Sequence, residues 1–246
     1  MLSKTTAKYI QSLQQKKFRD AHCAFIAEGP KVVNELLLDN IFECEHLFCT
    51  ERGFEELPVE VRKEAVVIKD FELEKISALV TAKDMLGVFR KQNTNSGHDI
   101  KNKLTIILHD IQDPGNLGTI IRTADWFGIE NIICSPATAD AYNPKVVQST
   151  MASLGRVNIF YTDIGAFIQK HNDIPIYAAV LQGRPLHEFA GAKEGFILIG
   201  NESRGLTDEL LSVATNLVTI PKTGKAESLN AAVATGIILY AFCNSR

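Results

Sequence analysis

The chain has 246 residues, of which 46% are hydrophobic, and its formal net charge is −3. This length and apolar content predict a folded protein with one large or two small domains, and the slight negative charge argues against a protein that coats nucleic acid through bulk electrostatics. The N-terminus has no apolar leader and no stretch approaches the roughly 18 apolar residues of a membrane helix, so we expect a soluble, cytoplasmic protein.

The cysteines are odd in number and none lies in a CxxC pair: Cys23, Cys44, Cys49, Cys134 and Cys243. A disulfide framework or a zinc site would show paired spacings. We therefore expect unpaired thiols and no bound metal.

Residues 1–92 alternate helical patterns with short β-like runs. Helices are expected at Thr5–Lys16, Pro30–Asp39 and Phe71–Ser77, and strands at Ala24–Ala27, His46–Cys49, Ala65–Ile68 and Leu86–Phe89. Short strands with β-branched and aromatic residues between helical periods indicate a small α/β domain.

The beginning of this domain is basic although the whole chain is slightly acidic. Its candidate contacts with phosphate groups are Lys16, Lys17, Arg19 and Lys31. A basic stretch of this kind either contacts phosphates or forms a solvated helix surface, and charge does not decide between the two.

A polar run from Lys91 to Lys103 has almost nothing to bury and predicts a linker, which we place at residues 93–103. Residues 104–246 then form a second domain. Its expected strands are Leu104–Leu108, Asn131–Cys134, Val157–Tyr161, Ile176–Val180, Phe196–Ile199 and Leu217–Ile220. Its expected helices are Leu117–Phe127, Pro144–Ser153, Ile164–Lys170, Asp208–Ala214 and Ser228–Phe242.

Strands that alternate with helices predict a Rossmann-like parallel sheet covered on both faces. The last helix is apolar on most sides, so we expect it to be buried. No G-x-G pair occurs, and Gly224-Lys225 is followed by Ala226, so the dinucleotide fingerprint and the P-loop are both missing. A nucleotide-dependent oxidoreductase is therefore disfavoured.

The segment from Asp113 to Gly128 follows the first strand of this domain. Open α/β sheets place ligands at the carboxyl ends of their strands. Asn116 offers both a donor and an acceptor near a helix start, and Arg122 lies one to two turns into that helix. The segment is either a capped helix start or part of a ligand site; Trp126 is expected to pack in the core.

Two later segments also follow strands. Leu198–Leu206 enters a loop in which Gly200 allows a close approach to the backbone and Gly205 permits a turn. Glu202 in this loop either accepts a hydrogen bond at a site or faces solvent. In the segment Ile220–Asn230, Ile220 ends a strand and Ser228–Asn230 opens the final helix, for which Ser228 is a candidate N-cap.

Together, the order, spacing and glycine placement of these three segments resemble the three motifs of the SpoU (TrmH-like) branch of the SPOUT methyltransferases, which methylate the ribose 2′-hydroxyl of RNA. The stretch Lys17–Leu36, with Phe-Ile-Ala-Glu-Gly-Pro-Lys-Val-Val, resembles the substrate-binding domain often fused to these enzymes, which is similar to RNA-binding ribosomal proteins. The resemblance implies a C-terminal trefoil knot that holds S-adenosylmethionine, and a homodimer with its active sites near the knot.

The resemblance also assigns site residues. It implies an active site made by Asn116, Arg122, Glu202, Ser228 and Asn230. It implies cofactor contacts at Gly200, Glu202, Ile220 and Leu229.

The chemistry of the reaction raises the question of the base. A ribose hydroxyl is a poor nucleophile, and a conventional base would be His, Glu or Asp, yet the histidine nearest to the motifs is His109, just upstream of the first. Arginine, with a pKa above about 12, ordinarily cannot accept a proton. Two roles therefore stay open for Arg122: it stabilises the developing alkoxide, or a substrate phosphate helps it to take the proton.

These observations predict an S-adenosylmethionine-dependent RNA 2′-O-ribose methyltransferase. Ribosomal RNA is the preferred substrate because the fused N-terminal domain is typical of members directed to rRNA. The alternatives are a tRNA 2′-O-methyltransferase, an enzyme that modifies an antibiotic-binding rRNA site, and a non-catalytic RNA-binding or ribosome-assembly protein of the same fold.

Overall fold

The computed structural model describes residues 2–92 and 99–244. Residues 93–98 of the predicted linker lie outside the described residues. The chain divides into two compact units: Met1–Asn93 together with Asp140–Gly155, and Thr94–Ala139 together with Arg156–Arg246. We call them the N-terminal unit and the C-terminal unit.

The N-terminal unit is built on a four-stranded sheet with the order β1-β4-β2-β3. Its strands are β1 (Ala24–Glu28), β2 (Cys44–Cys49), β3 (Ala65–Val67) and β4 (Met85–Arg90). Its helices are α1 (Lys4–Ser12), α2 (Lys16–His22), α3 (Pro30–Leu38), α4 (Glu51–Glu56), α5 (Asp70–Ile76) and α7 (Pro144–Thr150), with 3₁₀ turns η1 (Val59–Glu64) and η2 (Ser153–Gly155). β4 runs antiparallel to β1 and β2, whereas β3 runs parallel to β2.

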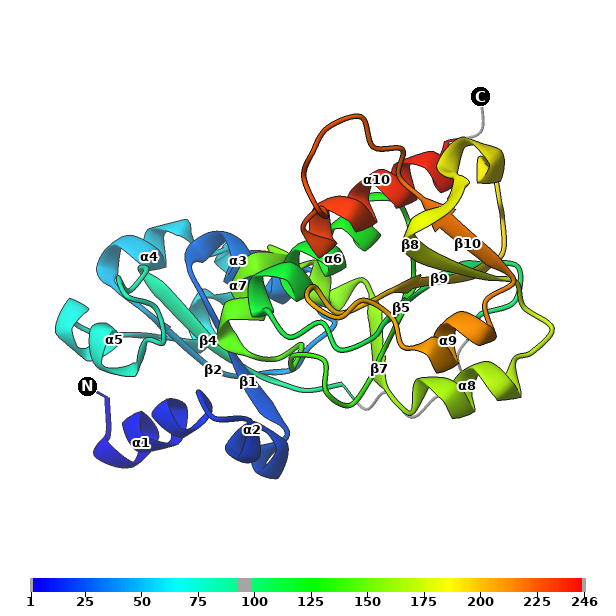
Figure 1. Cartoon of the computed structure of the whole chain (residues 1–246). Coiled ribbons are helices and arrows are strands. Elements are labelled where there is room, and N and C mark those ends of the chain that lie inside the picture. The colour runs from blue at the N-terminus through cyan, green and yellow to red at the C-terminus, as the bar shows by residue number, and fades with distance from the viewer. Residues whose placement is uncertain (1, 93–98, 245–246) are drawn as a thin grey trace. The chain divides into compact units, whose positions relative to one another are not determined.

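This sheet is covered on both faces, as the α/β prediction requires. Ile26 of β1 lies in an apolar cluster with Ile10 of α1 and Leu73 of α5. The next residue towards the N-terminus, Phe25, points to the opposite face, where its ring meets that of Tyr142 with the centroids 4.9 Å apart. Successive strand side chains alternate between faces, so β1 is buried on both. In Figure 1, α1 lies below this sheet and α3 and α7 lie above it.

The predicted strands of this unit are confirmed within one or two residues, but two helices, α2 and α4, were missed. The single helix expected at Thr5–Lys16 is two helices, because α1 ends at Ser12 and α2 begins at Lys16. α2 itself ends at Cys23, which adopts a left-handed conformation with φ 49°. Seven residues between two turns are too few to give a clear helical period in the sequence.

The C-terminal unit contains a six-stranded sheet with the order β10-β8-β9-β5-β6-β7. Its strands are β5 (Leu104–Leu108), β6 (Asn131–Cys134), β7 (Asn158–Tyr161), β8 (Ile176–Pro185), β9 (Gly195–Ile199) and β10 (Asn216–Thr219). Its helices are α6 (Pro114–Trp126), α8 (Ile164–Lys170), α9 (Asp208–Ser212) and α10 (Ala231–Cys243), with the 3₁₀ turn η3 (Leu186–Phe189). All five strand pairs are parallel, which confirms the predicted Rossmann-like α/β sheet.

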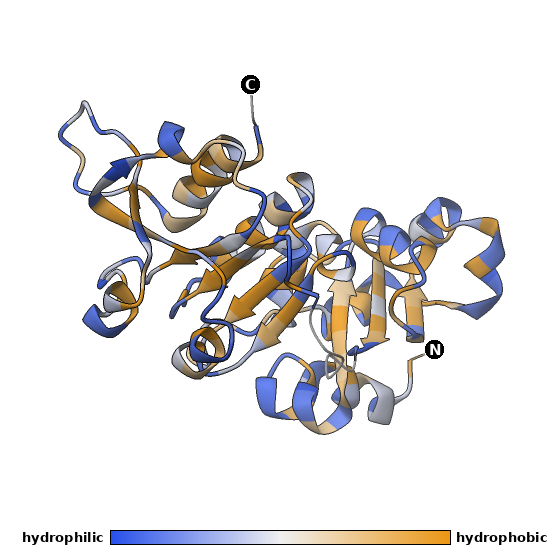
Figure 2. Ribbon diagram, turned by 90° about the vertical axis from the view of Figure 1, so that its right-hand side faces the viewer, coloured by the Kyte–Doolittle hydropathy of each residue, from blue (hydrophilic) through white to orange (hydrophobic). Residues whose placement is uncertain are grey.

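Helices cover both faces of this sheet. α8 and α9 share an apolar cluster with the central strands through Ile164, Phe167 and Leu210. Figure 1 shows α6 and α10 on the other face, and Figure 2 shows the strands of both units as predominantly hydrophobic. β5 and β9 are buried along their whole length, as expected of parallel strands covered on both sides.

Two predictions about helices in this half of the chain were wrong. α10 begins at Ala231 rather than Ser228, and only part of it is buried, since Val233, Ile237 and Tyr240 are exposed. The helix between β6 and β7, predicted at Pro144–Ser153, was expected to cover the parallel sheet; it forms α7 of the N-terminal unit. Periodicity predicts a helix but does not reveal which sheet it packs against.

Candidate active site

The three motif segments meet at one edge of the C-terminal sheet. β5 and β9 are neighbours, and the chain continues from β5 to β6 and β7 on one side but reaches β8 and β10 on the other. The point at which the strand order reverses is where open α/β sheets bind ligands, beyond the carboxyl ends of the strands. Asn116 and Glu202 follow β5 and β9, and lie at this point.

The first motif is held by a cap at the start of α6. Asp113 is the N-cap residue, and its Oδ1 accepts a hydrogen bond of 2.8 Å from the backbone N–H of Asn116. Pro114 occupies the first helical position, where a missing N–H costs nothing. The cap fixes the first turn of α6 and therefore the direction of the Asn116 side chain.

A chain of hydrogen bonds joins all three motifs. The Nδ2 of Asn116 donates to Glu202 Oε1 at 2.8 Å, and the Nδ2 of Asn230 donates to Asn116 Oδ1 at 2.8 Å. The side-chain amide of Asn116 thus donates to the second motif and accepts from the third. The structure brings together three of the five predicted catalytic residues; Glu202 and Asn230 lie 86 and 114 residues after Asn116 in the sequence.

The loop after β9 is held in one conformation by Asn201. Its Oδ1 accepts hydrogen bonds from the backbone N–H groups of Ser203 (3.0 Å) and Arg204 (3.1 Å), and its backbone pairs with Gly205. Gly205 has φ +69°, as the predicted turn requires, and a Cβ on Gly200 would lie 2.4 Å from the Gly205 carbonyl carbon. The backbone that comes close to Gly200 is therefore that of Gly205 in the same loop. In this conformation the loop places Glu202 within hydrogen-bond distance of Asn116.

Asp110, which the sequence analysis missed, braces this loop from β5. Its carbonyl accepts from Asn201 Nδ2 at 2.8 Å and its Oδ2 lies 3.5 Å from Arg204 Nη2, while Ser135 donates to its Oδ1 at 2.7 Å. Asp110 has φ +57°, a strained conformation for a residue other than glycine. An aspartate two residues after a buried parallel strand is the signal in the sequence that could have identified it. The neighbouring His109 has a buried Nδ1 that makes no hydrogen bond among the described groups and lies 3.8 Å from Asp110 Oδ1.

The cap of α10 is Asn230 rather than Ser228. The Oδ1 of Asn230 accepts from the backbone N–H groups of Ala232 (3.0 Å) and Val233 (3.3 Å). Asn230 therefore both caps the helix and binds Asn116. Ser228 and Leu229 lie in an exposed loop, residues 221–230, that follows Ile220. Capping does not explain a serine at position 228.

Arg122 is not part of this hydrogen-bond chain. It lies on the exposed side of α6, and within the described part of the chain its guanidinium makes no hydrogen bond or ion pair. Trp126, one turn further on, is 84% exposed, so its predicted packing in the core is wrong. Arg122 and Trp126 share a face because residues four apart on a helix are neighbours.

An apolar stripe on α10 is also exposed. Val233 (52%), Ile237 (38%) and Tyr240 (61%) lie at helical spacing on one side of α10. α10 packs beside α6, where Gly236 lies close to Thr123. Exposed large apolar side chains at helical spacing mark a surface that another molecule covers more often than a solvated one.

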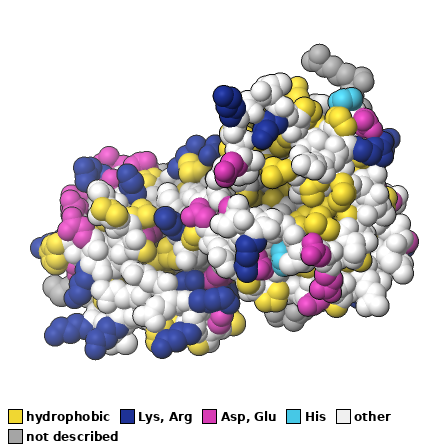
Figure 3. Space-filling view, viewed as in Figure 1, with side chains coloured by type: hydrophobic (Ala, Val, Ile, Leu, Met, Phe, Trp, Pro, Cys, Tyr) yellow, Lys and Arg dark blue, Asp and Glu magenta, His cyan; other side chains and the backbone are white. Residues whose placement is uncertain are grey.

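The candidate RNA contacts lie in the N-terminal unit. Lys16, Lys17 and Lys31 are exposed, and Figure 3 shows basic side chains along the α1 and α2 edge of this unit. Arg19 is buried, and its guanidinium is engaged by Asp140 and by backbone carbonyls. The predicted RNA contact of Arg19 is therefore wrong, because a buried guanidinium that already makes four hydrogen bonds cannot reach a phosphate.

Burial raises the pKa of the Cys134 thiol well above its usual range. Among residues 2–92 and 99–244, no group of three His, Cys, Asp or Glu side chains is arranged to hold a metal ion. No helix in those same ranges is long and apolar enough to cross a membrane.

Comparison with known families and structures agrees with this geometry. Residues 103–240 match the family model of the SpoU rRNA methylase family, and residues 4–87 match that of an MRM3-like substrate binding domain. The first match covers more than half of the chain and contains all three motifs.

Similar proteins and structures carry related names. The 23S rRNA (guanosine(2553)-2′-O)-methyltransferase RlmP of Bacillus subtilis is 34% identical over 138 residues, which are 55% of this chain and 56% of that protein. The chain spans about half the length of the curated relatives it matches.

Two solved structures match almost the whole chain. A TrmH-family protein from Porphyromonas gingivalis has a TM-score of 0.86 and 34% identity, covering 98% of both chains. The AdoMet-bound rRNA methyltransferase of Sinorhizobium meliloti has a TM-score of 0.83 and 31% identity, covering 98% of this chain and 95% of that one. The resemblance drawn from the three motifs is confirmed: the chain belongs to the SpoU rRNA methylase family.

Proposed function

We propose that the protein is an S-adenosylmethionine-dependent RNA 2′-O-ribose methyltransferase that acts on ribosomal RNA in the cytoplasm. The observation that carries the proposal is the hydrogen-bond chain from Glu202 through Asn116 to Asn230, at the edge where such sheets bind ligands. The relative from Bacillus subtilis is named as a 23S rRNA 2′-O-methyltransferase, which supports rRNA as the substrate.

The groups around this edge fit S-adenosylmethionine. Adenosine needs apolar contact and backbone donors and acceptors; the half-buried Ile220 and the exposed Leu229 offer apolar side chains, and Leu229 precedes Asn230 in the hydrogen-bond chain to Glu202. The Glu202 carboxylate complements a sulfonium charge. When bound, S-adenosylmethionine supplies an electrophilic methyl group; the cofactor-bound structure from Sinorhizobium meliloti supports this assignment.

The residues of the chain supply alignment and charge stabilisation. Asn116, fixed by its partners on both sides, offers a rigid polar group to the ribose, and alignment of this kind contributes several kcal/mol to catalysis. Ser228 lies in the loop before Asn230, where its hydroxyl is exposed. The Arg122 guanidinium is free of partners in the described chain and can stabilise the developing alkoxide of the ribose.

We assign RNA capture to the N-terminal domain, residues 1–92, with Lys16, Lys17 and Lys31 as phosphate contacts. The linker is residues 93–103, and residues 104–246 perform the transfer on a sheet whose C-terminal part forms the trefoil knot. The match of residues 4–87 to a substrate binding domain supports this division.

A homodimer explains the exposed face of α6 and α10. Four large exposed apolar side chains on two neighbouring helices are informative as a group, and a second copy of the chain would cover them: Trp126, Val233, Ile237 and Tyr240. Arg122 lies on the same face of α6 as Trp126. A dimer through this face would carry Arg122 into a water-poor interface, where its charge acts more strongly on a nearby alkoxide.

The test is transfer of labelled methyl groups from S-adenosylmethionine to unmodified RNA, separated into rRNA and tRNA, with wild type and Arg122→Ala side by side. We expect label in rRNA from the wild type and at least a 100-fold loss in the variant, with cofactor affinity nearly intact. Label in tRNA alone would favour the tRNA enzyme. Cofactor and RNA binding without transfer to either RNA would favour the non-catalytic protein.

A further inference from the structure

The segment Asp140–Gly155 belongs to the N-terminal unit although both of its ends continue into the C-terminal unit. It connects β6 with β7, which are parallel neighbours, so its helix α7 is the crossover helix of that pair. Such a helix ordinarily packs on the sheet that it connects. Here α7 packs instead on β1, a strand of the sheet in the N-terminal unit. We call Asp140–Gly155 the crossover segment.

The crossover segment is deeply seated in the N-terminal unit. Val146 and Val147 of α7 are fully buried, as is Leu154 beyond it. A Cβ on Gly155 would lie 3.1 Å from the Ile41 side chain, so the end of the segment also fits closely against this unit. The face of the sheet that carries Phe25 is therefore completed by residues that lie far away in sequence.

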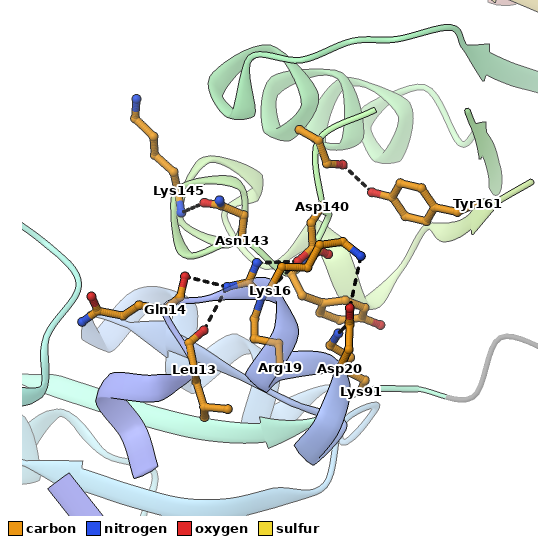
Figure 4. A network of polar contacts seen from close by, with 12 residues as sticks. Leu13, Gln14, Lys16, Arg19, Asp20, Lys91, Asp140, Asn143, Lys145 and Tyr161 are labelled. Atoms are coloured by element: carbon orange, nitrogen blue, oxygen red, sulfur yellow. Dashed lines mark hydrogen bonds and ion pairs between the residues drawn. The ribbon is translucent and has the colours of Figure 1, made fainter. Parts of the chain in front are cut away.

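A buried ion pair fixes the first residue of the segment. The Nη2 and Nε of Arg19 donate to Asp140 Oδ2 at 2.5 and 3.0 Å, and Nη1 donates to the carbonyls of Leu13 and Gln14, each at 2.9 Å (Figure 4). The Arg19 side chain is 2% exposed and that of Asp140 is 12% exposed. Arg19 thus joins the end of α1 to the start of the crossover segment. The other oxygen of Asp140 accepts from the backbone N–H of Tyr142 at 3.1 Å.

The two residues that flank the segment are hydrogen-bonded to the first motif or to the residues just before it. Ala139 precedes Asp140, and its N–H donates to the carbonyl of Ile111 at 2.8 Å, two residues before Asp113. Arg156 follows Gly155, and its Nε donates to Asp125 on α6 at 2.9 Å. α6 is the helix that carries Asn116 and Arg122.

Backbone strain near the end of the segment indicates that its conformation is imposed. Met151 and Ala152 are consecutive non-glycine residues with φ of 49° and 69°. Such conformations persist only where the surrounding structure determines them, and they cluster at functional elements.

We propose that the Arg19–Asp140 pair is a positioning contact: it fixes the start of the crossover segment, whose neighbour Ala139 is bound to Ile111, and so holds the backbone that leads into the motif beginning at Asp113. The proposal rests on the function proposed above. A buried ion pair is a weak net stabiliser compared with apolar packing, but it defines one geometry. Without the pair, the φ and ψ angles of Asp140 would be less restricted, and so would the path of the chain from Asp140 to Ala139.

The test uses the full-length protein, S-adenosylmethionine and unmodified ribosomal RNA transcribed in vitro. The single-turnover rate of methyl transfer and the dissociation constants for RNA and cofactor are measured for wild type, Arg19→Met, Asp140→Asn and the double variant. We expect Arg19→Met to lower the rate at least tenfold at saturating RNA, with both dissociation constants within twofold of wild type. The double variant should be no slower than the slower single variant, because both changes remove one contact.

A matched control is Arg62→Met. Arg62 lies in the same unit and its guanidinium also binds two carbonyls, those of Leu57 and Glu55, but it does not contact the crossover segment. Its rate should stay within twofold of wild type. If Arg19→Met does not fold, Asp140→Asn, which keeps an acceptor for the N–H of Tyr142, carries the same comparison.

Three results would overturn the positioning role. These are an unchanged rate in a folded Arg19 or Asp140 variant, a loss of RNA affinity that accounts for the whole loss of rate, and an equal loss of rate in Arg62→Met. An inactive wild type would instead refute the proposed function, so the two failures are distinguishable.

Discussion

Asn230 has two roles in the structure that one substitution can separate. Its Oδ1 caps α10 and its Nδ2 donates to Asn116. In Asn230→Asp the cap survives, since aspartate is as good an N-cap as asparagine. The donor is lost, and the Nδ2 group of Asn116 then becomes the one donor between two carboxylates, those of Glu202 and the new aspartate.

The expected magnitudes follow from these contacts. Asn230→Ala loses the cap and the hydrogen bond, about 1 kcal/mol each, or roughly 2 kcal/mol in total. For a chain of this size that lowers Tm by roughly 4–8 °C. Asn230→Asp loses only the hydrogen bond, so its Tm should fall by roughly 2–4 °C. Displacement of Asn116 by about 1 Å should lower activity about 100-fold in both variants.

Thermal unfolding and methyl transfer to rRNA are measured on the same preparations. Asp163→Ala is the control, because Asp163 caps α8 in the same unit through a 2.7 Å bond to the N–H of Ala166, away from the motifs. It should lose about 1 kcal/mol of stability and no activity. An Asn230→Asp enzyme with activity within threefold of wild type would refute the role of the hydrogen-bond chain. Equal loss of activity in Asp163→Ala would show that stability alone limits the assay.

Three further outcomes follow from single features. Ile237→Glu places a charge in the exposed stripe of α10 and should give a monomer by light scattering where the wild type is a dimer; a monomeric wild type would contradict the interface. Cys23 has φ 49° at the end of α2, so Cys23→Gly should raise Tm by roughly 2–4 °C, and a lower Tm would contradict the strain argument. Burial raises the pKa of Cys134, so near neutral pH it should resist alkylation in the folded protein while the exposed Cys23 reacts; equal labelling would contradict its burial.

The sequence predicted the sheet and the motifs because both depend on local signals. Continuous apolar runs such as Leu104–Leu108 mark strands buried on both faces, and the loops after them hold the polar residues. Asn116, Glu202 and Asn230 follow strands whose carboxyl ends share an edge, so their meeting could be expected from topology together with the family resemblance.

The wrong predictions concern what a side chain packs against, which local sequence does not determine. Arg19 looks like its lysine neighbours in the sequence, and its partner Asp140 lies 121 residues away. Asn230 rather than Ser228 caps α10, and its side chain also donates to Asn116, a contact between distant segments. Trp126 is exposed although tryptophan is highly buried on average, and the homodimer proposed above would cover it.

The most direct test of the central claim is the chemical position of the transferred methyl group. Unmodified rRNA is incubated with the protein and S-adenosylmethionine, digested to nucleosides and analysed by mass spectrometry. The account predicts one 2′-O-methylnucleoside that is absent when Arg122→Ala replaces the wild type. A methyl group on a base, or a 2′-O-methylnucleoside formed equally by the variant, would contradict it.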